Sequence, residues 1–265
     1  MSLILALQVC PLDVKDAIQL CQLISDMEPE AREDCEVWIV WRKDTGQDLV
    51  EECVKVLKPK FRAKHIRSRN FAKGHPEGSN LLWLTTIEEA RAMKLRVKKE
   101  QSDQFNGILT FEADCVPLRT TWISDLTREW EEKVINVKVH QDEGDIRSNL
   151  AQQWPRLEAM GHVHQEGTDK EHINGNMIVR LDIFDRYANL RGSPGNIPWD
   201  MWHRNVFRKI GVDTNLIFQH YNRPTITVDE LPHIRKNGVK PALFHGVKDG
   251  SARRHARTLL IDPIE

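Results

Sequence analysis

The sequence lacks any apolar run long enough to cross a membrane, because no stretch of about 18 consecutive apolar side chains occurs among its 265 residues. The apolar start from Leu3 to Val9 is followed by Pro11 and is too short for the core of a signal peptide. Internal repeats, low-complexity tracts and linkers are also missing. We therefore expect one globular domain over residues 1–265 that is neither exported nor embedded in a membrane.

Cysteine is scarce and follows no metal-binding pattern. The five cysteines are odd in number and form no CxxC pair, which argues against a disulfide framework and against a zinc site built from cysteine. Such usage fits a reducing compartment, and we expect the protein to act in the cytoplasm.

The chain also lacks a large net charge of either sign. Lysine and arginine number 38 against 39 aspartates and glutamates, so the net charge is −1 and the whole molecule has no strong field to attract nucleic acid or an anionic membrane. Any such role must fall to local basic segments. Two are present, Arg91 to Lys99 and the cluster Lys248, Arg253, Arg254 and Arg257.

Strand and helix patterns alternate along the first part of the chain. Bounded apolar runs predict strands at 2–9, 35–41 and 61–68, and apolar residues at helical spacing predict helices at 13–27, 47–57 and 79–99. This alternation is typical of an α/β fold with a central, mostly parallel sheet flanked by helices. Ligands of such folds bind beyond the carboxyl ends of the strands.

The most informative segment is the apolar run from Gly107 to Phe111, which predicts a central strand and is followed by Glu112 and Asp114. Residues two apart in an extended segment point the same way, so both carboxylates can face one site. Oxygen donors beside a pocket suit Mg²⁺ or Mn²⁺ bound together with a diphosphate. An isolated acidic pair is more often an ordinary turn after a strand, so this pattern needs support from elsewhere in the chain.

Beyond this segment the alternation becomes looser, with a helix predicted near 121–132 and strands near 134–139 and 176–180. Close to the carboxyl end, His245 ends a short apolar strand and Lys248 follows it. Imidazole is a good ligand for ions such as Mn²⁺, and lysine is a natural partner for a phosphate leaving group. A lone histidine is more often structural, so this pattern too depends on its context.

Two further segments between these points carry polar groups suited to a sugar. Asn174, Gly175 and Asn176 predict a tight turn whose amides can bond hydroxyl groups, although a plain hairpin turn would look the same. Asp200 follows Trp199 at a predicted helix start. An aromatic face stacks on sugar rings and a neighbouring carboxylate can accept a proton, while the helix dipole alone also favours an acid there.

The order of these segments resembles that of the GT-A glycosyltransferases, in which an apolar strand precedes an acidic DxD turn. The stretch from Ile108 to Leu118 carries the likeness, with Glu112 in place of the first aspartate. The resemblance implies that Asp114 and His245 bind Mn²⁺ or Mg²⁺.

The same resemblance assigns roles to other residues. It implies that Lys248 contacts the diphosphate of a nucleotide sugar and that Glu112 lies on the donor side, against the ribose, a metal-bound water or a lysine. It places Asn174, Gly175 and Asn176 near the transferred sugar. It makes Asp200 the general base if the reaction inverts, and the sequence does not decide between inversion and retention. Residues 1–118 would form the nucleotide-sugar-binding half and residues 119–265 the acceptor-binding half.

Two weaker patterns complete the candidates. Lys73 and Asn80 stand in a glycine-containing stretch that can serve the nucleotide, although it is neither a Walker motif nor a GxGxxG fingerprint. His162, His164 and His172 suggest zinc, but no partner spacing completes a recognised zinc set.

Together with these patterns, the resemblance implies a metal-dependent glycosyltransferase that moves a sugar from a nucleotide diphosphate sugar to an acceptor hydroxyl. UDP is the expected nucleotide. The acceptor is a large molecule, either a glycan or a hydroxymethylated base in phage-type DNA. The basic segments and the eight tryptophans favour DNA, and the net charge of −1 opposes it.

Two other classes of protein remain as alternatives. A sugar nucleotidyltransferase is disfavoured because the glycine-rich, basic loop that such enzymes carry after the first strand is missing between Gln8 and Asp13. A non-catalytic carbohydrate-binding protein with tryptophan platforms would need no metal site.

Overall fold

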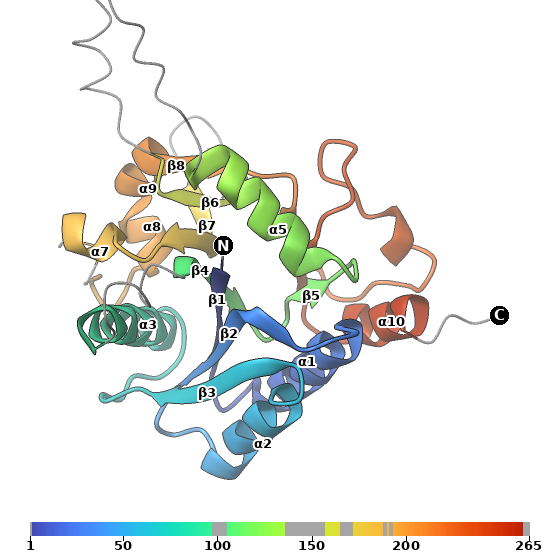
Figure 1. The fold of residues 1–265 in the computed structure, drawn as a ribbon, viewed down its shortest axis with the longest axis horizontal. Helices are drawn as coiled ribbons and strands as arrows, with labels where there is room; N and C mark the ends of the chain where they lie inside the picture. The colour runs from blue at the N-terminus through green and yellow to red at the C-terminus, as the bar shows by residue number, and fades with distance from the viewer. Residues whose placement is uncertain are drawn as a thin grey trace, which may run out of the picture.

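The structure is a computed structural model that describes residues 2–96, 105–135, 157–164, 172–187, 190 and 193–261. Its first half alternates strands and helices, as the sequence predicts (Figure 1). The elements are β1 (Ser2–Val9), α1 (Val14–Met27), β2 (Arg32–Trp41), α2 (Gln47–Leu57), β3 (Phe61–Arg67), α3 (Glu77–Arg96) and β4 (Phe105–Glu112). The strand predicted at 35–41 thus begins earlier, at Arg32, and the helix predicted at 79–99 begins at Glu77.

The central sheet has seven strands in the order β3-β2-β1-β4-β7-β6-β8. The four strands from β3 to β4 run parallel, and β7 (His172–Arg180) is antiparallel to β4. The predicted mostly parallel α/β sheet is therefore confirmed. Because β1 and β4 end at the same edge, Gln8 and Glu112 are register partners there.

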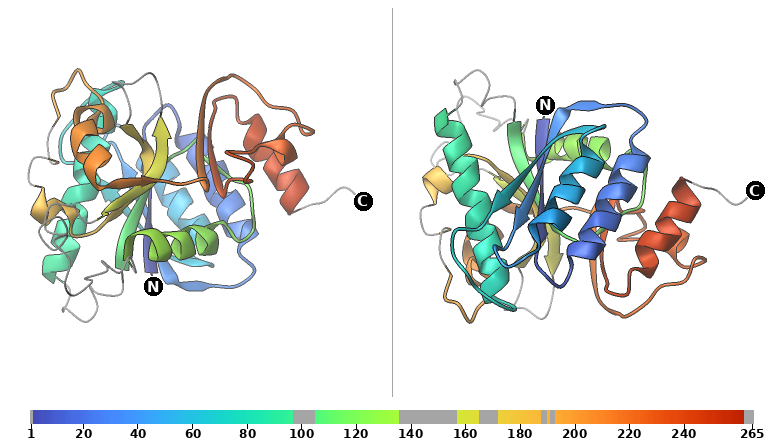
Figure 2. Two further views of the ribbon diagram at one scale, coloured as in Figure 1. Left: turned by 90° about the horizontal axis from the view of Figure 1, so that it is seen from above. Right: turned by 90° about the horizontal axis from the view of Figure 1, so that it is seen from below.

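Both faces of the sheet are covered, so alternate residues of β1 enter different cores. Leu5 and Leu7 pack in the core that α1 and α2 close, whereas Ile4 and Ala6 pack in the core that includes α3. Figure 2 shows α1 and α2 side by side on one face of the sheet. Burial of β1 on both faces explains why its sequence is a continuous apolar run and does not alternate between apolar and polar residues.

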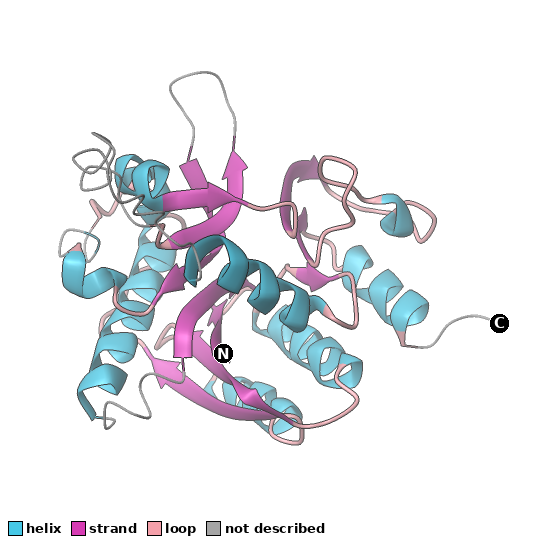
Figure 3. Cartoon of the chain, turned by 45° about the horizontal axis from the view of Figure 1, so that its top comes forward, coloured by secondary structure: helices cyan, strands magenta, loops and turns pink. Residues whose placement is uncertain are grey.

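The second half completes the large sheet and adds a smaller one of order β5-β10-β9 (Figure 3). The remaining elements are β5 (Val116–Pro117), α5 (Trp122–Trp130), η1 (Glu131–Ile135), β6 (Ala159–His164), α7 (Ile183–Arg186), α8 (Trp199–Trp202), α9 (Arg204–Ile210), β8 (Gly211–Asp213), β9 (Ile217–Arg223), η3 (Leu231–His233), β10 (Leu243–Val247) and α10 (Ser251–Leu260). Within the described ranges, no helix is long and apolar enough to cross a membrane.

The strand predicted at 134–139 is wrong where the structure describes it. Helix α5 continues into a π-helical turn, Glu131–Ile135, and residues 136–139 lie outside the described part. Val134 follows Trp130 by one helical turn and shares its buried face, at 2% exposed. Its apolar side chain thus fills the core from a helix.

The tight turn predicted at Asn174, Gly175 and Asn176 is also wrong, because all three residues lie inside β7. A Cβ atom at Gly175 would come within 3.2 Å of the Trp199 ring. Glycine therefore favours the close approach of α8 to β7, and it does not serve a left-handed backbone there.

Candidate functional site

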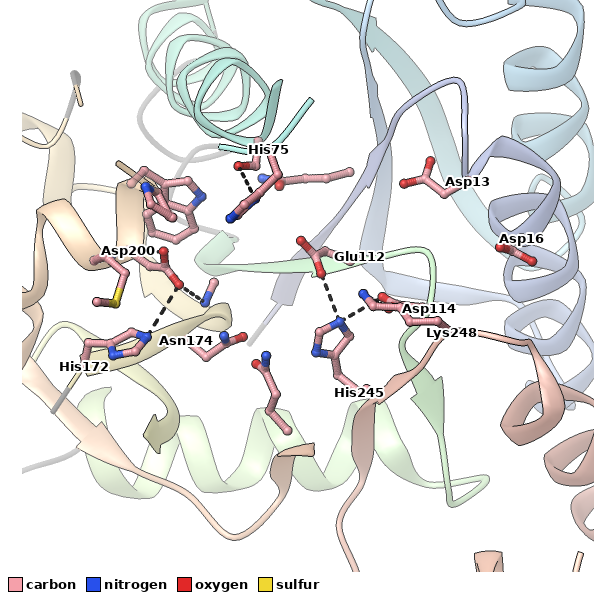
Figure 4. Close-up of a pocket in the computed structure, with 18 of the residues that line it drawn as sticks. Asp13, Asp16, His75, Glu112, Asp114, His172, Asn174, Asp200, His245 and Lys248 are labelled. Carbon is pink, nitrogen blue, oxygen red and sulfur yellow. Dashed lines mark hydrogen bonds and ion pairs between the residues drawn. The ribbon is translucent and has the colours of Figure 1, made fainter. Parts of the chain in front are cut away.

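A cavity of about 920 Å³ lies at the carboxyl ends of β1 and β4, where the two sheets meet. Strands β7, β9 and β10, the starts of α3 and α8 and the first turn of α1 also contribute to its wall. Figure 4 shows Glu112, Asp114 and Lys248 gathered around His245 at one end, with His172 and Asp200 at the other. Asn174 lies between the two groups.

The charged end of the cavity joins residues from both halves of the chain. Nε2 of His245 lies 2.9 Å from Oδ1 of Asp114 and 3.0 Å from Oε2 of Glu112. Lys248 forms an ion pair with the other carboxylate oxygen of Asp114. The structure thus brings together four residues that the sequence singled out in two distant segments.

Local backbone geometry presents these side chains. After β4 the N–H of Cys115 donates to the carbonyl of Glu112 at 3.0 Å, which closes the acidic turn. Strand β10 places His245, 6% exposed, at the cavity wall. Gly246 follows with φ of +124°, a conformation that a side chain would strain, and the chain then reaches Lys248.

The charges at this end stabilise one another. Burial disfavours the charged forms, but hydrogen bonds and opposite charge outweigh it and raise the pKa of His245 to about 9. Burial likewise opposes ionisation of Asp114 and Glu112, yet His245 and then Lys248 hold the pKa of both carboxyl groups below their ordinary values. The cluster is therefore an imidazolium and an ammonium set against two carboxylates.

This cluster fits a divalent cation. Asp114, Cys115 and His245 present ligand atoms within 4.8 Å of one another, the one such group of three among the residues that the structure describes. Nε2 of His245 lies close to a carboxylate oxygen of both Glu112 and Asp114, and a cation bound there would take the place of its proton. The Cys115 thiol donates to Oδ1 of Asn176 at 3.2 Å, and burial raises its pKa, so oxygen and imidazole donors remain the ligands that suit Mg²⁺ or Mn²⁺.

The opposite end of the cavity centres on Asp200 at the start of α8. Its carboxylate accepts hydrogen bonds from the N–H groups of Gly175 at 3.2 Å and Met201 at 2.9 Å, and Nε2 of His172 lies 4.0 Å from Oδ2. Burial nevertheless raises the pKa of Asp200 above its ordinary value. Trp199, which stacks on Trp83 at 3.7 Å, fixes the helix start against the core.

The two asparagines of β7 have different positions. Asn174 lines the cavity. Asn176 is 2% exposed and accepts from the N–H of Glu112 at 3.1 Å, while its own amide donates to Asn174 at 3.0 Å. Asn176 therefore ties β7 to the acidic turn from inside the core.

Several site residues that the sequence predicts lie away from this cavity. Its lining includes neither Lys73 nor Asn80. Asn80 donates to the carbonyl of Ile197 at 2.8 Å and so holds the loop before α8. Among the proposed zinc ligands His172 lies beside Asp200, His162 contacts the Phe218 ring, and the side chain of His164 lies outside the described part.

One member of the basic cluster near the carboxyl end, Arg253, is buried in the structure. Its side chain is 3% exposed, pairs with Asp16 and donates to the carbonyl of Ala113 at 2.8 Å. It thus holds the acidic turn from behind, because Ala113 lies between Glu112 and Asp114. A run of arginines in a sequence cannot reveal which one turns inward.

Sequence reasoning also missed polar residues of the cavity wall, Gln8, Asp13, His75 and Gln219. Asp13 follows the first strand, which is the one positional signal that could have indicated it. Burial raises the pKa of Asp13 to about 6 although the N–H and thiol of Cys10 donate to its carboxylate. The other three carry no motif.

No protein-family model matches the chain, and no curated protein matches its sequence. Solved structures do match its fold. An amino-terminal fragment of TarS from S. aureus is 9% identical, with a TM-score of 0.50, over 98% of this chain and 64% of that one. The chain therefore spans less than two thirds of the TarS fragment.

An active-site mutant of the galactosyltransferase LgtC is 11% identical, with a TM-score of 0.50, over 92% of this chain and 87% of that one. Both matches are GT-A glycosyltransferases, so the GT-A fold implied by the sequence resemblance is confirmed.

Proposed function

We propose that this protein transfers a sugar from a nucleotide diphosphate sugar to a hydroxyl acceptor, with a divalent metal ion. The observation that carries the proposal is a single cavity with a charged cluster fit for a metal and a diphosphate at one end and a buried carboxylate at the other. The GT-A fold supports it. UDP is the nucleotide that we expect.

The charged end would hold the donor. Asp114 and His245 would bind Mn²⁺ or Mg²⁺, whose charge would stabilise the leaving diphosphate. Lys248, whose ammonium already faces Asp114, is placed to contact a phosphate oxygen. Glu112 would accept a hydrogen bond from the ribose or from a metal-bound water. Glu112 and Asp114 of this end belong to residues 1–118, and His245 and Lys248 belong to the half 119–265.

The opposite end would activate the acceptor. A hydroxyl beside Asp200 can give its proton to the carboxylate as its oxygen forms the bond to the anomeric carbon, while the bond from that carbon to the diphosphate breaks. The raised pKa of Asp200 makes it a stronger base than an exposed aspartate. Asn174 and Gly175 of β7 line the space between and would face the transferred sugar.

A glycan is the acceptor that we favour. Two of the three arginines near the carboxyl end that pointed to DNA are engaged in the structure, since Arg253 is buried and Arg257 pairs with Asp26 at 3.0 Å. Arg91 and Lys94 face Asp185. A hydroxymethylated base in DNA is therefore the second candidate, and steep weakening of duplex binding with added salt would favour it.

Calorimetry with a panel of nucleoside diphosphates and Mn²⁺ tests the proposal, followed by assay of sugar release from the nucleotide sugar that binds. We expect one diphosphate to bind in the presence of Mn²⁺ and its sugar to be hydrolysed slowly without acceptor. A carbohydrate-binding protein would show no such hydrolysis, and a nucleotidyltransferase would instead exchange pyrophosphate.

The five free cysteine thiols support a reducing cytoplasm as the place of action.

A further inference from the structure

Gln219 carries a buried polar atom that the protein leaves unpaired. The side chain is 5% exposed and lines the cavity, and its Oε1 has no hydrogen-bond partner among the described residues. Buried polar groups in folded proteins are nearly always paired, and those that are not point to a missing partner. Because Gln219 lines the cavity, a water or a ligand held in the cavity is the partner that this position allows.

The register of the smaller sheet places this amide beside the metal cluster. Gln219 and His245 are register partners on the parallel strands β9 and β10. Their backbones are therefore about 4.8 Å apart and their side chains point to the same face of the sheet. Both residues line the same cavity.

The chemistry of an amide separates Gln219 from the residues around the diphosphate. Phosphate oxygens carry negative charge, and in the proposed function they contact Lys248 and the bound cation. A neutral amide suits a neutral hydroxyl, which can both donate and accept, so the match holds for either orientation of the amide. The sugar of a nucleotide sugar is joined to the phosphate that the metal holds, so its hydroxyls lie next to that end of the cavity.

We infer that Gln219 is a specificity-determining residue that hydrogen-bonds a hydroxyl group of the transferred sugar. This inference rests on the proposed function and adds to it which side chain distinguishes one donor sugar from another. A site that pairs a buried amide with a hydroxyl discriminates against a sugar without that hydroxyl, because the amide is then left unsatisfied.

The test compares the bare nucleotide with the nucleotide sugar. Gln219→Met removes the amide and keeps the length of the side chain, and Gln22→Met is the matched control, because Gln22 donates to Asp26 on α1 away from the cavity. In calorimetry with Mn²⁺, we expect Gln219→Met to bind the nucleoside diphosphate as the parent does. It should bind the nucleotide sugar about tenfold more weakly.

Deoxy-sugar donors identify the hydroxyl. One deoxy position should weaken donor binding by the parent and by Gln22→Met, and should make no difference to Gln219→Met. If Gln219→Met binds every donor as the parent does, or loses the bare nucleotide and the nucleotide sugar equally, the inference is wrong while the proposed function stands. A parent protein that binds neither ligand would overturn both.

Discussion

At the end of the cavity formed by β4 and β10, Asp114 and Glu112 face His245 and Lys248, whereas at the end formed by β7 and α8 Asp200 faces two backbone amides and His172. Cationic partners lower the pKa of the first two carboxyl groups, and burial raises the pKa of Asp200. The pKa values of two aspartates in one cavity, Asp114 and Asp200, are thus shifted in opposite directions.

This difference separates two tasks. A carboxylate with a low pKa stays charged and suits a cation, whereas one with a raised pKa suits exchange of a proton. Damage at the charged end should therefore remove metal and donor binding, and damage at the Asp200 end should slow turnover of a donor that is still bound. The following predictions test this separation, starting with the largest effect.

The largest effect is expected from Asp114→Ala and from His245→Ala. Each removes a proposed ligand of the metal, and we expect metal-dependent nucleotide binding to weaken by more than about 100-fold, since even residues behind metal ligands are worth 10–100-fold. Calorimetry with Mn²⁺ and the nucleoside diphosphate measures it. Cys115→Ala is the matched control, because the thiol bonds Asn176, and it should bind like the parent. If Asp114→Ala and His245→Ala both bind as the parent does, the proposed metal site is wrong.

Asp200→Asn should leave donor binding in place and lower kcat by about 100-fold or more, since a general base acts on the acceptor hydroxyl in the transition state. Steady-state kinetics with varied donor, beside calorimetry of the donor, separates the two quantities. Equal losses of donor affinity and kcat would show that the two ends of the cavity do not have separate tasks. An unchanged kcat would leave Asp200 as a helix-start residue.

The pH dependence of the reaction should carry the signature of Asp200. Burial and the charge of Glu112 raise its pKa, while His172 and the backbone amides lower it, with a net shift upward. Only the ionised form accepts a proton, so kcat/KM should fall about tenfold per pH unit below this raised pKa. The fall should begin at a higher pH than for an ordinary aspartate. The remaining activity of Asp200→Asn should not show this fall of kcat/KM at low pH. If the fall persists in the variant, it is caused by the titration of another group.

The parallel half of the fold could be predicted because its signals are local. Strands β1, β2 and β4 are buried apolar runs, and the position of Glu112 and Asp114 follows from the end of a strand. In the second half, strand β7 was mistaken in part for a turn because Asn174 and Asn176 have turn propensity. Their amides are satisfied by each other and by the N–H of Glu112, a contact that no local pattern contains.

The cavity shows the same limit. His245 and Asp114 could be assigned to one site through the resemblance to GT-A enzymes, but the positions of Gln219 and Arg253 depend on strand register and on the inward turn of one side chain. Tertiary packing decides both. A sequence thus indicates residues at strand ends and in recognisable motifs more readily than residues whose positions depend on tertiary packing.

The smallest effect is expected from Arg253, which acts on the charged end through the backbone. Its guanidinium bonds the carbonyl of Ala113 at 2.8 Å and pairs with Asp16, so Arg253→Ala should loosen the turn that presents Asp114. We expect Mn²⁺ affinity to fall by about three- to tenfold and the free energy of unfolding to fall by about 1–3 kcal/mol.

Arg254→Ala removes the same charge from an exposed neighbour on α10 and should change neither quantity measurably. Arg253→Lys should recover part of the stability but less of the metal affinity, because an ammonium group cannot bond the Ala113 carbonyl and Asp16 with the fixed geometry of a guanidinium. Titration of the metal alone, monitored by the signal of free Mn²⁺ in electron paramagnetic resonance, separates this positioning role from general destabilisation. Equal Mn²⁺ affinities for Arg253→Ala and Arg254→Ala would show that Arg253 is a core residue without influence on the charged end.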